Sequence, residues 1–272
     1  MKINDLPPSV AVIIVTWNNE NDIRECLNSI EKTIYSNLKA VIVVDNNSSD
    51  RTTEIIQKDF PNIELIQTGK NLYFTGGNNF GFNFAINKYA PEFVVTLNPD
   101  TIVEPEWIDK LIAIATKDPK IGIVAPKIKF WNNQNEGKIN SAGMIFDGFL
   151  QGYDRGFEEE DHGQYNFTEE VIAVSGTCML LRVKMLEQVG MFWEKLRMYL
   201  EDLELCIRAR KKGWKIFYTS GTTIHHKWMQ STNQSSIVRR KGWMKRNWFL
   251  IALRHYSLKS KLAMLKHYFF SK

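Results

Sequence analysis

The sequence has few cysteines and no long hydrophobic run, and each absence excludes a class of protein. Its three cysteines, Cys26, Cys178 and Cys206, are odd in number and widely spaced, which argues against a disulfide framework and favours a reducing compartment. The longest unbroken apolar runs have six residues, whereas a membrane-spanning helix needs about 20. Residues 1–8 contain no apolar signal core. We therefore expect a cytoplasmic protein that does not span a membrane.

Acidic residues are missing from the last quarter of the chain. All 30 Asp and Glu residues precede Leu205, whereas 16 of the 35 Lys and Arg residues follow Glu204. The net charge of +5 is therefore the balance of an acidic body and a basic tail. Hydrophobic residues make up 44% of the chain, which is enough to bury a core and excludes a disordered protein. The length of 272 residues favours one α/β domain with a small appendage.

Continuous Val- and Ile-rich runs in the first half predict strands that are buried on both faces. These strands are expected at residues 10–15, 40–44, 63–67 and 93–97. Apolar residues at helical spacing lie between them, and Pro105 suits the first turn of a further helix. Alternating strands and helices predict a three-layer α/β sandwich.

The pattern changes after residue 130. Residues 147–168 carry four glycines among clustered acids, which indicates a flexible loop over a site. Residues 171–181 return to strand character. Residues 199–212 fit a helix that Gly213 can end, and residues 214–219 fit a strand.

The first strand ends without a glycine, which counts against a site for NAD or FAD because pyrophosphate must approach the backbone there. The second strand ends at Asp45, which could accept hydrogen bonds from a nucleobase imide or a ribose hydroxyl. The alternative is an Asx turn that caps the next helix. The glycine-rich segment 69–81 suits an anion or a nucleotide. Its alternative is a simple turn, with Phe80 and Phe84 in the core.

The fourth strand stops at Asn98 and Asp100. A carboxylate at the tip of a buried strand needs a charged partner. A Mg²⁺ or Mn²⁺ ion that bridges a diphosphate would be such a partner, because these ions prefer oxygen ligands. The alternative is an Asx-Pro turn.

Two further clusters lie downstream. Glu201 and Asp202 open a predicted helix, where one carboxylate could act as a general base or where both could simply complement the helix dipole. His225 and His226 follow a predicted strand. Successive side chains of an extended segment face opposite ways, so only one histidine should reach a site. A structural histidine is the alternative for either.

The order of these motifs resembles that of the family-2 glycosyltransferases, in particular their rhamnosyltransferase-like bacterial members. The resemblance covers roughly residues 9 to 232. Its motifs in chain order are Thr16-Trp17-Asn18, Asp45-Asn46-Asn47-Ser48-Ser49-Asp50, Gly76-Gly77-Asn78-Asn79-Phe80-Gly81, Leu97-Asn98-Pro99-Asp100, the segment 175–182, Glu201-Asp202 with the helix to Arg208, and His225-His226.

The resemblance implies a GT-A fold, which is a three-layer sandwich around a mostly parallel sheet, in residues 1–232. Residues 233–272 are then a basic, aromatic-rich helical appendage. The implied activity is transfer of a sugar, with inversion, from a dTDP- or UDP-sugar such as dTDP-rhamnose. The implied acceptor is a hydroxyl of a glycan or a lipid-linked acceptor in cell-surface polysaccharide synthesis.

The resemblance also assigns roles to single residues. Asp100 corresponds to the last, metal-binding member of the DxD motif, and Asn98 replaces the first. The metal, Mg²⁺ or Mn²⁺, would be bound by Asp100, the donor diphosphate and His225. Asp202 would be the catalytic base, and Glu201 would help to hold the acceptor. The residues implied to line or flank the nucleoside pocket are Thr16, Asn18, Glu20, Asp45, Asn71, Gly76 and Asn79.

The tail from residue 228 mixes basic and aromatic residues, which suits a helix lying on an anionic membrane. The alternatives are a helix packed on the catalytic domain and, without any recognition motif, a nucleic-acid contact.

Two other functions compete with the glycosyltransferase. A nucleotidyltransferase of similar fold would need a glycine-rich basic loop after the first strand, which is missing. The other is an inactive sugar-nucleotide-binding or membrane-scaffold protein.

Overall fold

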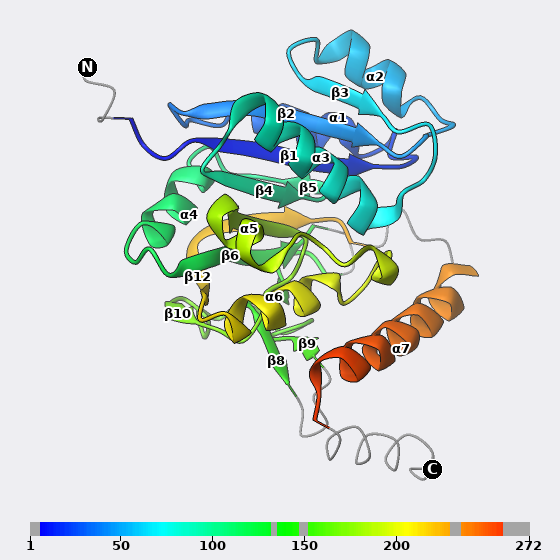
Figure 1. Cartoon of the computed structure of the whole chain (residues 1–272). Helices are drawn as coiled ribbons and strands as arrows, with labels where there is room; N and C mark the ends of the chain where they lie inside the picture. The colour runs from blue at the N-terminus through cyan, green and yellow to red at the C-terminus, as the bar shows by residue number, and fades with distance from the viewer. Residues whose placement is uncertain (1–5, 132–134, 147–151, 229–234, 258–272) are drawn as a thin grey trace.

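The four Val- and Ile-rich runs form neighbouring strands of the main sheet, and the run at residues 63–67 lies at its edge (Figure 1). The computed structural model describes residues 6–131, 135–146, 152–228 and 235–257. In these residues the main sheet has ten strands, in the order β10-β12-β6-β11-β4-β1-β2-β3 with β5 beside β12 and β7 beside β6, and β8 and β9 pair separately. The strands are β1 (Val10–Thr16), β2 (Leu38–Asp45), β3 (Glu64–Gln67), β4 (Phe93–Leu97), β5 (Thr101–Ile102), β6 (Ile121–Phe130), β7 (Ile139–Ser141), β8 (Met144–Phe146), β9 (Gly152–Asp154), β10 (Thr168–Glu170), β11 (Cys178–Arg182) and β12 (Lys215–His226).

Parallel pairing brings several strand ends to one edge of the sheet. Strand β1 is parallel to both β2 and β4, β2 is parallel to β3, and β6 is parallel to β12. Strand β11 is antiparallel to both of its neighbours, β4 and β6. Thr16 at the end of β1 is in register with Asp45 at the end of β2, and Ile14 with Leu97 of β4. The loops that follow β1, β2 and β4 therefore meet.

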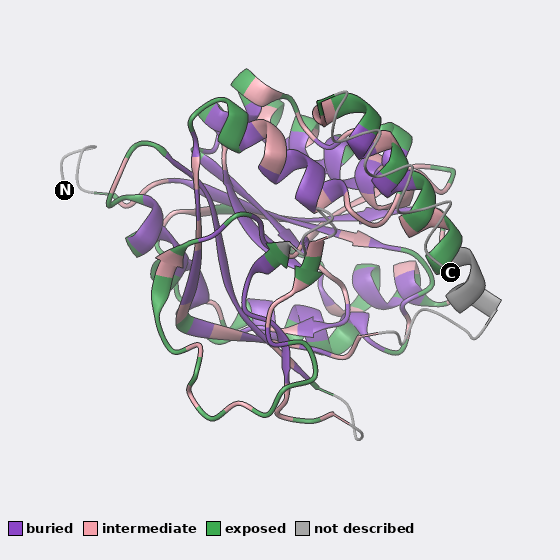
Figure 2. Cartoon of the chain, turned by 90° about the horizontal axis from the view of Figure 1, so that it is seen from below, coloured by how far each residue is buried: buried purple, intermediate pink, exposed green. Residues whose placement is uncertain are grey.

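Helices cover both faces of the sheet, as Figure 2 shows by the burial of their inner sides. Alternate residues of β1 point to opposite faces. Ala11 and Ile13 pack with α3, α5 and α6, whereas Val12 and Ile14 pack with α1, α2 and α4. This arrangement confirms the three-layer sandwich. The helices are α1 (Ile23–Glu31), α2 (Thr52–Asp59), α3 (Tyr73–Tyr89), α4 (Trp107–Ala115), α5 (Val183–Val189), α6 (Glu201–Lys211) and α7 (Ser235–His255), with a 3₁₀ turn η2 (Glu194–Leu196).

The glycine-rich segment is not a simple turn, because most of it is the first half of α3. A Cβ atom on Gly77 would lie 2.6 Å from Val15, and one on Gly81 would lie 2.5 Å from Ile13. These glycines therefore let α3 pack closely on β1. The expectation of Phe80 in the core is wrong, since it is 43% exposed. Its neighbour Phe82 is buried instead.

Helix α7 lies beside α6 and β9 (Figure 1). Its inner side is buried through Asn247, Trp248, Ile251 and Ala252. No helix within the described residues combines the length and the apolar character that crossing a membrane requires.

Candidate active site

The loops after β1 and β2 are tied together by residues that the sequence assigns to the donor pocket. The Oδ1 atom of Asn18 accepts a hydrogen bond of 2.8 Å from the backbone N–H of Ser49. Glu20 accepts one of 3.0 Å from the backbone N–H of Arg51. Thr16 bonds within its own loop, by donating its hydroxyl to Asn19 over 3.0 Å. These three side chains lie at the expected edge of the sheet, where they shape the loops.

Asp45 closes a turn at the end of β2. It is 1% exposed, and its Oδ2 atom accepts a hydrogen bond of 3.1 Å from the backbone N–H of Ser48. Its neighbour Asn46 donates to the carbonyl of Tyr73 over 3.0 Å and so joins the loop to the start of α3. The turn that the sequence offers as an alternative role for Asp45 is therefore present.

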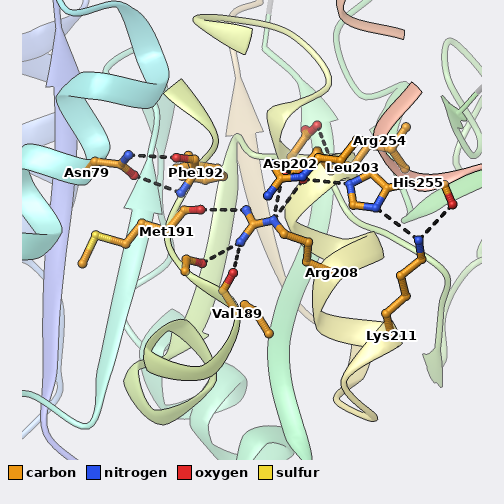
Figure 3. A network of polar contacts seen from close by, with 12 residues as sticks. Asn79, Val189, Met191, Phe192, Asp202, Leu203, Arg208, Lys211, Arg254 and His255 are labelled. Carbon is orange, nitrogen blue, oxygen red and sulfur yellow. Dashed lines mark hydrogen bonds and ion pairs between the residues drawn. The ribbon is translucent and has the colours of Figure 1, made fainter. Parts of the chain in front are cut away.

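The candidate donor-site residues before and within α3 have two different roles in the structure. Asn71 and Gly76 line a cavity of about 420 Å³ together with Lys70 and Arg197. Asn79 also borders this cavity, but both ends of its amide are used (Figure 3): it donates to the carbonyl of Phe192 over 2.9 Å and accepts from the N–H of Phe192 over 3.0 Å. Asn79 thus holds the segment before η2 in place.

Asp100 lies against a histidine at the end of β4. Its Oδ1 atom is 3.2 Å from Nε2 of His226, and both residues are buried. Burial would raise the pKa of Asp100, but His226 and Lys227 outweigh this effect and hold the pKa below its usual value. Asn98 reaches the same ring, with its Nδ2 atom 3.5 Å from Nε2 of His226.

The structure brings His226, and not His225, to Asp100. In β12 the two residues point to opposite faces, as the extended backbone requires. The ring of His225 instead packs edge-on against Trp131, with centroids 5.1 Å apart. Burial and then Lys129 lower the pKa of His225. Of the two adjacent histidines, His226 is therefore the one that lies beside Asp100.

The Asp100–His226 pair fits part of a site for a divalent cation. The Nδ1 atom of His226 lies 3.1 Å from the amide oxygen of Asn140, and a hydrogen bond donated there leaves Nε2 able to bind a cation beside Asp100. In the described ranges no group of three or more His, Cys, Asp or Glu residues could hold a metal ion. An ion beside Asp100 would therefore need further oxygen ligands, which water can provide.

Glu201 and Asp202 open α6 close to this edge. Asp202 accepts two backbone hydrogen bonds of 2.7 Å, at Oδ2 from Gly176 and at Oδ1 from Leu203. Burial raises its pKa, and these two N–H groups counteract part of the rise. Glu201 is 5% exposed, and its Oε2 atom has no hydrogen-bond partner within the described residues. Burial and the charge of Asp202 raise the pKa of Glu201 well above its usual value.

A third carboxylate, Asp154, joins the site without having been predicted. It ends β9, inside the acidic segment 147–168, and its Oδ1 atom is buried without a partner in the described residues. Burial, with the charge of Asp202 as a smaller contribution, raises the pKa of Asp154 to about 6. The clustering of acids and glycines around it is a loop signal, which does not distinguish Asp154 from the neighbouring acids.

A family model described as Glycosyltransferase like family 2 matches residues 7–245. The chain belongs to this family. The resemblance inferred from the motifs is thereby confirmed, and the glycosyltransferase interpretation replaces the nucleotidyltransferase alternative.

This family-2 glycosyltransferase is similar to proteins named for sugar transfer. The low-salt glycan biosynthesis hexosyltransferase Agl10 of Haloferax volcanii is 29% identical over 219 residues, which span 76% of this chain and 63% of that protein. The N-acetylglucosaminyl-diphospho-decaprenol L-rhamnosyltransferase of Mycobacterium tuberculosis is 25% identical over 261 residues, which span 84% of this chain and 82% of that protein.

The fold is also that of solved glycosyltransferase structures. GalNAc-T7, solved with UDP, GalNAc and Mn²⁺, superposes with a TM-score of 0.65 at 15% identity, over 81% of this chain and 44% of that one. This likeness confirms the α/β fold that the GT-A expectation required.

Proposed function

We propose that this family-2 glycosyltransferase is an inverting, metal-dependent hexosyltransferase of cell-surface polysaccharide synthesis. Its donor would be a dTDP- or UDP-sugar, with dTDP-rhamnose as one candidate. Its acceptor would be a hydroxyl of a glycan or of a polyprenol-linked sugar. The mycobacterial relative, named as a rhamnosyltransferase for a decaprenol-linked acceptor, supports this choice of donor and acceptor.

The observation that carries the proposal is the connection between Asp202 and the loop of Asp100. Gly176 donates its N–H to Asp202, and the adjacent Thr177 accepts the N–H of Asn98 over 3.0 Å. A single loop before β11 therefore contacts both the candidate base and the strand end that carries the candidate metal ligand. A general base next to a diphosphate site is the arrangement that single displacement at an anomeric carbon needs.

In this reaction Asp202 accepts the proton of the acceptor hydroxyl while that oxygen forms a bond to the anomeric carbon. The bond between the anomeric carbon and the diphosphate oxygen breaks, and its electron pair leaves with the nucleotide. The raised pKa of Asp202 makes its carboxylate a stronger base than an exposed one. The two N–H groups hold it in one orientation. Glu201 would accept hydrogen bonds from acceptor hydroxyls through its unpartnered oxygen.

Asp100 and His226 would hold the cation, which supplies charge stabilisation to the departing diphosphate. We propose that Thr16, Asn18, Glu20 and Asp45 border the nucleoside, because they shape the adjoining edge of the sheet. Asn71 and Gly76 would lie near it, whereas Asn79 would act through Phe192.

We also propose peripheral contact with anionic membrane on the cytoplasmic side through the outer side of α7. Phe249 and Leu253 are 42% and 46% exposed there, and Lys241 is exposed on the same helix. Exposed apolar side chains beside lysine suit the interface of an anionic bilayer.

A panel of UDP-, dTDP- and GDP-sugars tests the proposed function. Each is incubated with the full chain, Mn²⁺ or Mg²⁺ and a polyprenol-linked saccharide, and both transfer and donor hydrolysis are measured. We expect transfer from a uridine or thymidine donor that stops when EDTA is added. Binding of a sugar nucleotide with neither transfer nor hydrolysis would instead support the inactive binding protein.

A further inference from the structure

The residues immediately before Glu201 and Asp202 adopt an unfavourable backbone conformation. Arg197, Tyr199 and Leu200 have φ angles of 63°, 73° and 66°, which non-glycine residues rarely adopt. This conformation is unfavourable for such residues unless their surroundings hold it. Since α6 begins at Glu201, this segment sets the direction from which the candidate base enters the site.

One side chain of α7 holds most of this segment. Asn247 is 0% exposed, and its Nδ2 atom lies 2.8 Å from the carbonyl oxygens of Leu196, Met198 and Tyr199. Three carbonyl partners require the NH₂ end of the amide to face the segment. The carbonyl oxygen of Asn247 faces away and accepts a hydrogen bond of 2.9 Å from Arg246.

The neighbouring carbonyls are bonded as well. Arg246 donates to the carbonyl of Lys195 over 2.9 Å, and the N–H of Thr75 in α3 donates to the carbonyl of Arg197 over 3.0 Å. The carbonyl of Leu200 accepts the first hydrogen bond of α6, from Glu204. Every carbonyl from residue 195 to residue 200 thus has a partner, and α7 provides four of them. The side chain of Leu200 also packs against Trp248 and Ala252 of α7.

We propose that Asn247 is a positioning residue for sugar transfer. It holds residues 196–199 in the conformation that directs the Asp202 carboxylate towards the acceptor. Helix α7 is then a part of the active site, in addition to any role in membrane contact. This inference rests on the proposed role of Asp202 as the base.

Asn247→Asp tests the inference, because it keeps the shape of the side chain and removes its N–H donors. A misplaced catalytic group can cost about 10²-fold in rate, so we expect kcat to fall by up to that factor. The donor Kd measured by calorimetry should stay at its wild-type value, because no donor-binding residue is changed. Hydrogen exchange in residues 197–203 should become faster.

His255→Gln is the matched control. It weakens a different contact of α7, the 2.9 Å contact between Nε2 of His255 and Glu204 (Figure 3). This contact does not involve residues 196–199. This variant should lower Tm while kcat and the exchange of residues 197–203 stay unchanged. Equal kcat values for the two variants at equal loss of Tm would overturn the inference.

A second variant keeps the test decisive if Asn247→Asp does not fold. Arg246→Ala removes an exposed side chain, so the protein should fold, and it removes the donor to Lys195 and to the amide of Asn247. We expect a smaller fall in kcat at unchanged donor Kd, and an unchanged kcat would count against the inference.

Asp202→Asn separates the inference about Asn247 from the proposed role of Asp202. If it transfers sugar as fast as wild type, the proposed base is wrong whatever Asn247 does.

Discussion

The Oδ2 atom of Asp202 lies 2.7 Å from the backbone nitrogen of Gly176, which donates a hydrogen bond to it. This contact fixes the carboxylate at the start of α6 against the loop that leads into β11. A Cβ atom on Gly176 would lie 3.4 Å from that same oxygen, an ordinary contact distance. The loop therefore holds the Asp202 carboxylate through the backbone N–H of Gly176.

Asp202→Asn should lower kcat by about 10²–10⁴-fold, because an amide cannot accept the proton of the acceptor hydroxyl. The substitution keeps the size of the side chain, so the donor Kd from calorimetry should not change. Asp118→Asn serves as the control, since it removes an acid that pairs with Lys215 on the surface. Turnover of Asp202→Asn close to that of the control would refute the assignment.

His226→Gln and His225→Gln should differ in their metal dependence, although the two residues are adjacent. Only His226 lies at Asp100, so its replacement should raise the Mn²⁺ concentration needed for donor binding about tenfold or more. His225→Gln should keep the wild-type requirement. Titration of Mn²⁺ against a fixed UDP- or dTDP-sugar, followed by calorimetry, measures this. The reverse order of effects would restore His225 as the ligand.

Glu204→Gln should destabilise the fold by about 3–5 kcal/mol, because it removes the counter-charge of Arg208, whose side chain is only 12% exposed. Glu204 is fully buried and faces Arg208 at 2.8 Å, His255 at 2.9 Å and Arg254 at 3.2 Å. Figure 3 shows that Arg208 also reaches the carbonyl of Met191, over 2.6 Å. The network thus joins α6 to α7 and to the segment before η2.

The effect of Glu204→Gln on stability should depend on pH. Burial acts to raise the pKa of Glu204, but His255 and Arg208 outweigh it, and the pKa lies below its usual value of 4.5. The stabilisation is therefore present above pH 4.5 and is lost as the pH falls through the folded-state pKa. The Tm difference between wild type and variant should shrink in acid. Glu54→Gln, at an exposed pair with Arg51, should show little difference at any pH.

Asp154→Asn should stabilise the protein at neutral pH and not in acid. Burial raises the pKa of Asp154 from 3.8 to about 6, and the charged groups that face it are Asp202, His226 and Arg240. Between these two pH values the folded state binds more protons than the unfolded state, so stability falls as pH rises. The shift corresponds to at most about 3 kcal/mol. Tm measured in EDTA at pH 4 and pH 7.5 tests this, and an equal effect at both values would contradict it.

The sequence contains most of the information on the central fold and only part of that on the site. Asp100 and Asp202 stand out in the sequence as candidates because each follows or begins a regular element, and strand ends of a parallel sheet share an edge. The choice between His225 and His226 could not be made, because β12 has a register shift between Thr219 and Thr223 that resets which face each residue takes. The alternation of apolar and polar residues along the sequence does not reveal such a shift.

Asn247 illustrates a different limit. It stands in a basic, aromatic segment where one amide has no distinguishing neighbour, and its three partners lie about fifty residues earlier in the chain. The contact exists only because α7 packs along α6 and η2. A long-range contact of this kind leaves no local pattern, so the composition of the tail alone leaves both membrane contact and packing on the catalytic domain open.

The outer side of α7 should bind anionic vesicles. Phe249→Ser combined with Leu253→Ser removes the two large apolar side chains that are exposed between residues 240 and 257, and it leaves the buried side of α7, including Asn247 and Trp248, intact. We expect the double variant to sediment less with vesicles containing phosphatidylserine. Lys241→Glu should lower partitioning about fivefold or more, because each cationic residue near such a surface contributes about 1 kcal/mol. Its effect should disappear at high salt, whereas that of the apolar variant should persist.

Ile34→Ser is the matched control, since Ile34 is 65% exposed and lies in the turn after α1. It removes exposed apolar surface without touching α7. Equal sedimentation of this control, the double variant and wild type would remove α7 as the membrane contact. Asn247 faces inward from the same helix. If Phe249→Ser/Leu253→Ser loses vesicle binding but keeps the wild-type kcat on a water-soluble acceptor, the two sides of α7 act separately.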